Sequence, residues 1–333
     1  MIGKVIAILA LVFSLTFIER SWANADDIYN PLKPYIVLIP GAGSNGGNIY
    51  VKNLTKLLKI TGHGEYFGRY QEILKEIGLP SMLCPKTKDK DRRPLLARAL
   101  ECVVAIQAAI VQGTIQNRRP IVRRNLILLG HSMGGNIARM VANDPRLKPF
   151  IHSVVTVATP HQGTPIADFI FDQYAKGWES EFYRTVIEGI GFTPVEKEYL
   201  AELRTERLPN SPQVYYAQDV RALPYINYYS LTNSMEHTLM PPLEVTNMVL
   251  KDEIKKRGLD HTSYGVANDG LAPEYSMVYG KVIGSVKADH WETLCIGILK
   301  FTKGCEQTKQ VLFPFLKNLN QEIAASLLTK EKI

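Results

Sequence analysis

One short run of the 333-residue chain combines a nucleophile with a backbone that would expose it. Ser132 lies between Gly130 and Gly134 in a Gly-His-Ser-Met-Gly-Gly run. An apolar segment at residues 125–129 precedes this run, and a helical pattern follows it. Flanking glycines allow the sharp strand-to-helix turn that lifts a serine hydroxyl out of a sheet. The pattern predicts a nucleophilic serine beside the Met133 N–H, at a helix N-terminus that favours developing negative charge.

A serine hydroxyl needs a base, and the base needs a carboxylate that orients it. Among the seven histidines, His290 fits best because it follows a strand pattern at residues 281–286 by a short loop. Asp269 lies in an Asn-Asp-Gly turn, between the serine and this histidine in chain order. His261 is the rival base. The weaker candidates are His237 for the base and Asp289, Asp260 and Asp252 for the acid.

A second donor for an oxyanion hole is expected from a glycine-rich loop. An apolar strand pattern at residues 35–39 ends in Pro40-Gly41-Ala42-Gly43, so the Ala42 N–H can face the same pocket as that of Met133. A loop of this kind could cradle a phosphate instead. It lacks both the glycine spacing of dinucleotide-binding loops and the lysine of phosphate-binding P-loops. His131 and His161 are interpreted as packing or pocket-lining residues.

The elements that must position these groups alternate along the chain. Strand patterns occur at residues 35–39, 125–129, 153–158, 225–231 and 281–286. Helical patterns occur at residues 72–77, 94–111, 136–141 and 308–328. Such alternation implies right-handed crossovers and a mostly parallel central sheet, so the fold class is α/β. No element is predicted with any preference over residues 233–260.

The alternation stops at residues 165–224, where a helical pattern predicts an insertion above the sheet. One apolar helical face is formed there by Phe182, Tyr183, Val186, Ile187 and Ile190. A stripe of this kind fits a movable lid over the pocket and a fixed cap helix packed on the core equally well. We therefore expect one catalytic domain at residues 26–333 with a lid or cap at residues 165–224.

Taken together, these motifs resemble secreted bacterial triacylglycerol lipases of the α/β-hydrolase superfamily. The serine turn, Thr-Pro-His-Gln-Gly-Thr at 159–164, Asn-Asp-Gly-Leu at 268–271 and Gly-Lys-Val-Ile at 280–283 carry the resemblance. It implies an α/β-hydrolase fold with helices on both faces of the sheet. It also implies a catalytic triad of Ser132, Asp269 and His290, and an oxyanion hole formed by the N–H groups of Ala42 and Met133.

Two departures from the family pattern bear on these expectations. The oxyanion loop begins Pro40-Gly41, where such lipases usually have His-Gly. Glu292 stands where many of them place an aspartate that binds calcium. A glutamate can bind calcium through oxygen, but the sequence offers no clear second acidic ligand. We expect Glu292 to be solvated or to begin a helix, and we expect the chemistry to require no cofactor.

The composition is that of an ordinary globular protein, with 46% hydrophobic and 21% charged residues. It excludes a disordered chain and a multi-span membrane protein. A thin, scattered net charge of +7 does not favour nucleic-acid binding. Lys4, an apolar run at residues 5–17 and Ala23-Asn24-Ala25 predict a signal peptide at residues 1–25, removed near Ala25. The apolar run is short for a membrane span, so a secreted or periplasmic protein is expected.

Export would place the four cysteines in an oxidising compartment. None lies in a Cys-x-x-Cys pair, which gives little support to a zinc or thioredoxin-like site. The pairing preferred by sequence proximity is Cys84 with Cys102 and Cys295 with Cys305. Four buried thiols acting as small hydrophobic residues are the alternative.

The sequence thus favours an exported serine esterase or lipase that cleaves fatty-acyl esters. Phospholipid deacylation, thioester cleavage and acyl transfer could use the same residues. An inactive α/β-hydrolase protein that binds lipid or a partner is the alternative from another class. A transient contact with a membrane or lipid surface fits a lipid substrate. Acyl-chain length, headgroup and oligomeric state are not determined by these residues.

Overall fold

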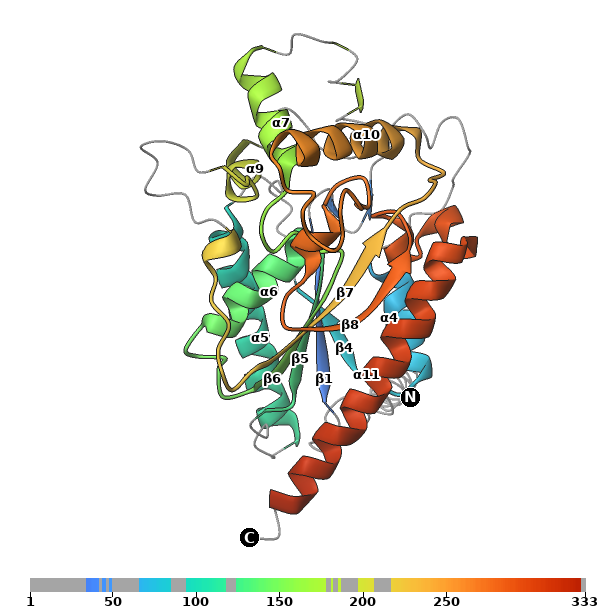
Figure 1. Ribbon diagram of the computed structural model, residues 1–333. Coiled ribbons are helices and arrows are strands. Elements are labelled where there is room, and N and C mark those ends of the chain that lie inside the picture. The colour runs from blue at the N-terminus through green and yellow to red at the C-terminus, as the bar shows by residue number, and fades with distance from the viewer. Residues whose placement is uncertain are drawn as a thin grey trace, which may run out of the picture.

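The computed structural model describes residues 34–41, 44–45, 48–49, 66–84, 94–117, 124–177, 181, 185–186, 197–206 and 217–330. Its centre is a six-stranded sheet in the order β4-β1-β5-β6-β7-β8, and each neighbouring pair is parallel (Figure 1). The strands are β1 Tyr35–Ile39, β4 Ser81–Leu83, β5 Leu126–His131, β6 Ile151–Val157, β7 Asn227–Ser234 and β8 Lys281–Lys287. A separate antiparallel pair consists of β2 Ser44–Asn45 and β3 Asn48–Ile49. The predicted parallel sheet is confirmed.

The central strands form because their side chains are apolar on both faces. All six residues of β5 are buried, as are six of the seven in β6. A parallel sheet is covered by helices on both sides, so its inner strands lack the polar alternation of half-exposed strands. Five of the six strands were predicted close to their observed bounds. The exception is β4, whose three partly buried residues are too few to show a pattern.

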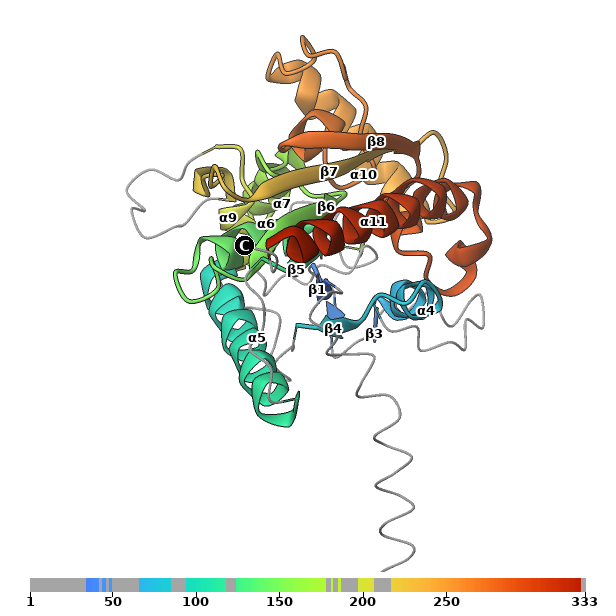
Figure 2. The ribbon, with the colours of Figure 1, turned by 90° about the horizontal axis from the view of Figure 1, so that it is seen from below.

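Helices cover both faces of the sheet, as the family resemblance implied. On one face lie α5 (Leu95–Asn117) and α6 (Met133–Asn143), and on the other lie α4 (Gly68–Glu76) and α11 (Lys303–Lys330) (Figures 1 and 2). Single 3-10 turns occur at η1 Ala217–Asp219, η2 Glu274–Met277, η3 Glu292–Leu294 and η4 Gly297–Phe301. In the part of the chain that the structure describes, no helix combines the length and the apolar character needed to cross a membrane. The predicted signal peptide lies outside the described residues.

Two disulfides confirm the pairing preferred from sequence proximity. Cys84 at the end of β4 is bonded to Cys102 in α5, and Cys295 after η3 is bonded to Cys305 in α11. The first bond joins an edge strand to the helix packed beside the serine turn. The second ties the loop that follows His290 to the closing helix.

Above the carboxyl ends of the strands lie α7 (Pro165–Ala175), α9 (Lys197–Glu202) and α10 (Pro241–Lys256) (Figure 1). The first two form helical parts of the predicted insertion, whereas α10 occupies the stretch for which no element is predicted from the sequence. Of the apolar stripe, Val186 is buried. Phe182, Tyr183, Ile187 and Ile190 lie outside the described residues.

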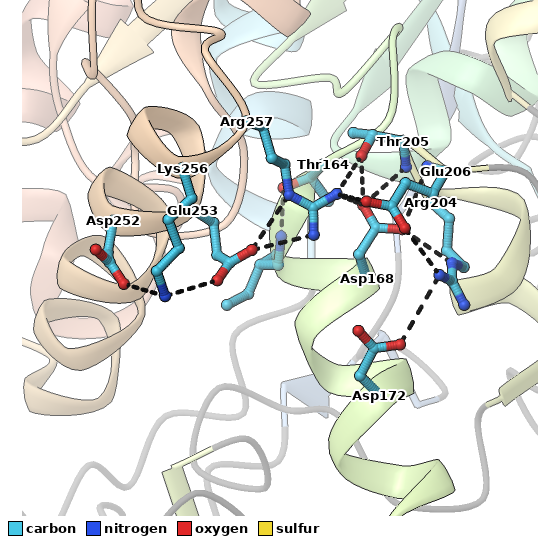
Figure 3. Close-up of polar contacts among 11 residues, drawn as sticks. Thr164, Asp168, Asp172, Arg204, Thr205, Glu206, Asp252, Glu253, Lys256 and Arg257 are labelled. Atoms are coloured by element: carbon cyan, nitrogen blue, oxygen red, sulfur yellow. Dashed lines mark hydrogen bonds and ion pairs between the residues drawn. The ribbon is translucent and has the colours of Figure 1, made fainter.

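A buried ion-pair network joins these segments above the sheet (Figure 3). Asp168 of α7 is fully buried and accepts hydrogen bonds from Arg204 Nε at 2.9 Å and Arg257 Nη1 at 3.1 Å. The same carboxylate accepts the backbone N–H of Thr205 at 3.1 Å. Arg257, at the end of α10, also pairs with Glu253 at 3.1 Å. One carboxylate therefore joins α7, the segment after α9 and the end of α10.

Candidate active site

Ser132 sits on a strained turn between β5 and α6. Its backbone has φ 56° and ψ −139°, a combination that a residue with a side chain rarely adopts. The flanking glycines are required by close packing. A Cβ on Gly134 would lie 2.0 Å from the carbonyl oxygen of Ile39, and one on Gly130 would lie 2.5 Å from Gly135 Cα. The expected sharp turn is present, and it presents a partly exposed serine at the carboxyl end of a central strand.

The helix after this turn begins three residues earlier than its sequence pattern indicated. Met133 is the first residue of α6, and Ser132 directly precedes it. The first N–H groups of a helix have no acceptor within the helix, and they carry the positive end of its dipole. The Met133 N–H is therefore suited to bind negative charge beside the serine. Ala42, the other predicted donor, lies outside the described residues.

Two loops at the carboxyl ends of the strands bring Asp269 and His290 together. His290 Nδ1 lies 2.7 Å from Asp269 Oδ2, and both side chains are buried. The other oxygen of the carboxylate, Oδ1, accepts the backbone N–H groups of Leu271 at 2.9 Å and Ala272 at 2.7 Å. These bonds fix the orientation of the carboxylate, so that its Oδ2 atom faces His290 Nδ1.

The opposite nitrogen of His290 is free to accept a proton. Its Nε2 atom is buried and forms no hydrogen bond with Ser132 or any other residue that the structure describes. A buried polar atom without a protein partner is costly, and its position makes this nitrogen the candidate proton acceptor of the site. Catalytic hydrogen bonds are often loose in an empty site and tighten around the substrate.

The rival bases and two of the rival acids, Asp252 and Asp260, are not brought to this place. His237 and His261 are both exposed, and the Nδ1 of His261 lies 2.6 Å from the Gly258 carbonyl oxygen. Asp252 is exposed and pairs with Lys256, and Asp260 is exposed. His161 belongs to the core, where its ring nitrogens lie 3.2 Å from Arg139 and 3.0 Å from Thr156. Burial, followed by the charge of Arg139, lowers the pKa of His161 well below its ordinary value.

The neighbouring carboxylates fix the backbone of the His290 loop. Asp289 Oδ1 accepts the N–H groups of Trp291 and Glu292, both at 2.8 Å, and Glu292 Oε2 accepts the N–H of Asp289 at 2.8 Å. This reciprocal pattern resembles a capping box and closes the turn that leads into η3. Burial, followed by the charge of Glu292, raises the pKa of Asp289 to about 6.

Glu292 therefore begins a helical turn, as one of its two predicted interpretations stated, but it is buried and not solvated. Its Oε2 atom already accepts a backbone N–H, which does not favour a calcium ligand. Within the described ranges, no group of three or more histidine, cysteine or acidic side chains is arranged to hold a metal ion.

Three further residues contact the site, and the sequence motifs did not reveal them. Asn233 Nδ2 donates to Asp269 Oδ2 at 3.2 Å. Arg98 Nη2 donates to the carbonyl oxygens of Pro40 and Gly41 at 3.1 and 3.2 Å. Tyr66 Oη accepts the Gly41 N–H at 3.1 Å. All three belong to elements that are distant in sequence from their partners, so no local pattern could identify them.

The fold and this arrangement can be compared with known proteins. The mature form of the Bacillus licheniformis lipase BlEst2 superposes with a TM-score of 0.51 at 16% sequence identity, covering 86% of this chain and 93% of that chain. The Staphylococcus hyicus lipase gives 0.49 at 15% identity, covering 92% and 97%. Lipase 1 from Pelosinus fermentans gives 0.48 at 15% identity, covering 87% and 99%.

At these identities the similarity concerns the fold. The parallel sheet, the helices on both faces and the turn at Ser132 define an α/β-hydrolase fold, as the sequence motifs implied. Within it, residues 95–190 match a family model described as the PGAP1-like alpha/beta domain. A search of curated proteins returns no match to this chain.

Proposed function

We propose that this protein is a serine hydrolase that cleaves carboxylic esters of fatty acids. Ser132 is the nucleophile, His290 is the general base and Asp269 orients the base. The observation that carries the proposal is the state of His290: Asp269 holds its Nδ1 at 2.7 Å, while its buried Nε2 has no partner among the described residues. A histidine in this state is ready to accept a serine proton.

The proposed reaction has two halves. Ser132 Oγ attacks the ester carbonyl carbon while its proton passes to His290 Nε2, and this proton then leaves with the alcohol product. A water molecule next gives a proton to the same nitrogen and attacks the acyl-serine, which releases the fatty acid and restores Ser132. In both halves the carbonyl oxygen becomes negative. The N–H groups of Met133 and Ala42 are the proposed donors to it.

The surroundings of Asp269 support this assignment electrostatically. His290 becomes positive in each half-reaction, in a buried environment where an isolated charge is unfavourable. Two backbone N–H groups and Asn233 hold the carboxylate in place beside the ring of His290. The ion pair formed with Asp269 stabilises the protonated base.

The proposed substrate class rests on the proteins with a similar fold. The compared structures from Bacillus licheniformis, Staphylococcus hyicus and Pelosinus fermentans are described as lipases. Fold alone does not determine the substrate, so phospholipids, thioesters and acyl transfer are tested beside neutral lipid. The two disulfides support the proposed export, because such bonds are typical of oxidising compartments.

Labelling by a fluorophosphonate tests the proposed nucleophile on the full chain. Wild type should be labelled covalently, Ser132→Ala should not, and Ser326→Ala, a change on the distant helix α11, should be labelled as wild type. Absence of labelling in a folded wild type would favour an inactive binding protein. A panel of p-nitrophenyl esters of increasing chain length, with triglyceride and phospholipid emulsions, then identifies the substrate.

In the proposed chemistry His290 accepts and returns every proton that is transferred, so the reaction should proceed without a metal. Activity on a soluble ester should therefore survive EDTA at low temperature. A large, immediate loss that calcium reverses would contradict this.

We also propose that the insertion at residues 165–224 acts as a lid for aggregated lipid. The buried Val186 supports a closed position, whereas the network around Asp168 fastens only the base of the insertion. Replacing Val186 and Ile187 by serine should reduce activity on emulsified lipid and spare a short soluble ester, with little change in melting temperature. A joint fall of all three quantities would identify a fixed cap.

A further inference from the structure

The histidine beside the nucleophile lies at the centre of a buried hydrogen-bond chain. His131 Nδ1 lies 2.6 Å from Tyr66 Oη, and that oxygen accepts the Gly41 N–H at 3.1 Å. On the other side of the ring, His131 Nε2 lies 3.1 Å from the His290 carbonyl oxygen and 2.9 Å from Thr293 Oγ1. Tyr66 and His131 have no solvent exposure. The chain therefore runs from the oxyanion loop, through the serine turn, to the loop of the base.

The proton positions along this chain follow from its two ends. The Gly41 N–H can only donate, so the Tyr66 oxygen accepts from it and its own O–H donates to His131 Nδ1. The His290 carbonyl can only accept, so the His131 proton lies on Nε2. One tautomer of the neutral His131 imidazole satisfies every group, and all donors in this hydrogen-bond chain point in one direction.

Both ends of this hydrogen-bond chain contact the proposed catalytic groups. A Cβ on Gly41 would lie 2.7 Å from Ser132 Cβ, so this part of the loop is in direct contact with the nucleophile. At the other end, the His290 carbonyl belongs to the base itself, and Thr293 Oγ1 donates to the same carbonyl at 2.8 Å. The ring centroids of His131 and His290 are 4.9 Å apart.

We propose that His131, with Tyr66 and Thr293 on its two ring nitrogens, is a positioning residue that fixes the oxyanion loop and the His290 loop relative to Ser132. This inference rests on the proposed hydrolase function and adds a role for the histidine that the sequence interpreted as packing. Misplacement of reacting groups by about 1 Å can cost about 100-fold in rate. A rigid link between two separate loops prevents such displacement.

The charge state of His131 suits this role. Burial, followed by the neighbouring His290, keeps the pKa of His131 well below its ordinary value. The ring therefore stays neutral while His290 gains and loses its proton, and the direction of the hydrogen-bond chain does not change during turnover.

The decisive variant is Tyr66→Phe, which keeps the ring and removes the oxygen between Gly41 and His131. We expect kcat for p-nitrophenyl butyrate, normalised to fluorophosphonate-titrated sites, to fall by about 10- to 100-fold, with KM changed by less than about threefold. Tyr228→Phe is the matched control, because its phenol oxygen accepts the Leu223 N–H at 3.1 Å at the opposite end of the sheet from Ser132. The control should keep the wild-type kcat.

A double-mutant cycle tests whether the effect passes through His131. Thr293→Val removes the hydroxyl on the Nε2 side, and Tyr66→Phe removes the one on the Nδ1 side. If the ring transmits position, the two losses in kcat should not multiply, and the double variant should be at least about fivefold more active than the product of the single effects. Two independent structural defects would give simple multiplication.

The outcomes separate this inference from the proposed function. If wild type is not labelled by fluorophosphonate and hydrolyses no ester, the proposed function fails. If wild type is active, but Tyr66→Phe retains the kcat of Tyr228→Phe per titrated site, the positioning role is refuted. Multiplicative effects in the cycle would also refute it, even if the single variants are slow. Should Tyr66→Phe fail to fold, His131→Gln and Thr293→Val form the cycle.

Discussion

Replacing Asp269 by asparagine should nearly abolish ester hydrolysis while preserving the fold. The structure dictates how the new amide is oriented. Two backbone N–H groups, from Leu271 and Ala272, point at Oδ1, so the amide oxygen must remain there. The amide NH2 is then forced into the position of Oδ2, where it faces His290 Nδ1 at 2.7 Å.

A donor at that position reverses the proton arrangement of His290. Nδ1 must then accept a hydrogen bond, so the proton of the neutral ring moves to Nε2, and Nε2 can no longer take the proton of Ser132. Loss of the base in this manner lowers kcat by about 10,000-fold, equivalent to about 5 kcal/mol in activation free energy. Hydrolysis of p-nitrophenyl butyrate near pH 8 measures this, with circular dichroism to check the fold.

Asp289→Asn is the matched control for this experiment. It removes an adjacent buried carboxylate, but an asparagine oxygen can still accept the N–H groups of Trp291 and Glu292. Its kcat should remain within about threefold of wild type. If Asp269→Asn retains more than a tenth of the wild-type kcat, or if both variants lose activity equally, Asp269 does not set the tautomer of His290.

Three further predictions concern stability. Because the pKa of Asp289 is raised from 3.8 to about 6 in the folded chain, its contribution to the free energy of unfolding is most favourable below pH 4 and is lost as the pH rises through 6. The stability of Asp289→Asn relative to wild type should therefore increase by about 3 kcal/mol between pH 4 and pH 7.5. If urea unfolding gives the same stability difference between the two proteins at both pH values, the raised pKa is contradicted. Asp168→Asn should cost about 3 to 5 kcal/mol in the same assay. Asp172→Asn, whose side chain is 54% exposed and 3.9 Å from Arg204, should cost about 0.5 kcal/mol or less. Equal losses would mean that the network does not hold α7, α10 and the segment after α9 together. Gly134→Ala should yield no folded protein, because its Cβ would lie 2.0 Å from a backbone oxygen of β1. Gly177→Ala, whose Cβ would contact nothing and whose only cost is a positive φ, should lose about 1 to 2 kcal/mol of stability and remain soluble. A soluble Gly134→Ala would refute the packing argument.

Features with a local cause were predictable from the sequence. The turn at Ser132 depends on a buried strand, closely spaced glycines and a helix within about a dozen residues, so its pattern identifies it. The two disulfides join cysteines separated by 18 and 10 residues, and sequence proximity identified the correct pairs. The parallel sheet followed from the alternation of strand and helix patterns.

Other elements escaped prediction for equally physical reasons. The helix α10 buries Thr246 and Asn247 among its apolar residues, which interrupts the pattern that marks an amphipathic helix. Glu292 was given a solvated alternative because its charge favours water. Its burial depends on the N–H of Asp289, a partner that becomes available only once the loop has folded.

The sequence by itself thus determined the sharp turn at Ser132, the order of the serine, acid and base candidates, the sheet class and the disulfides. Tertiary structure decided which histidine meets which carboxylate, and it added Tyr66, Arg98 and Asn233 around them. The physical reason is the parallel sheet. It gathers the carboxyl ends of strands far apart in the chain at one edge, so the contacts that orient each group depend on how separate loops pack there.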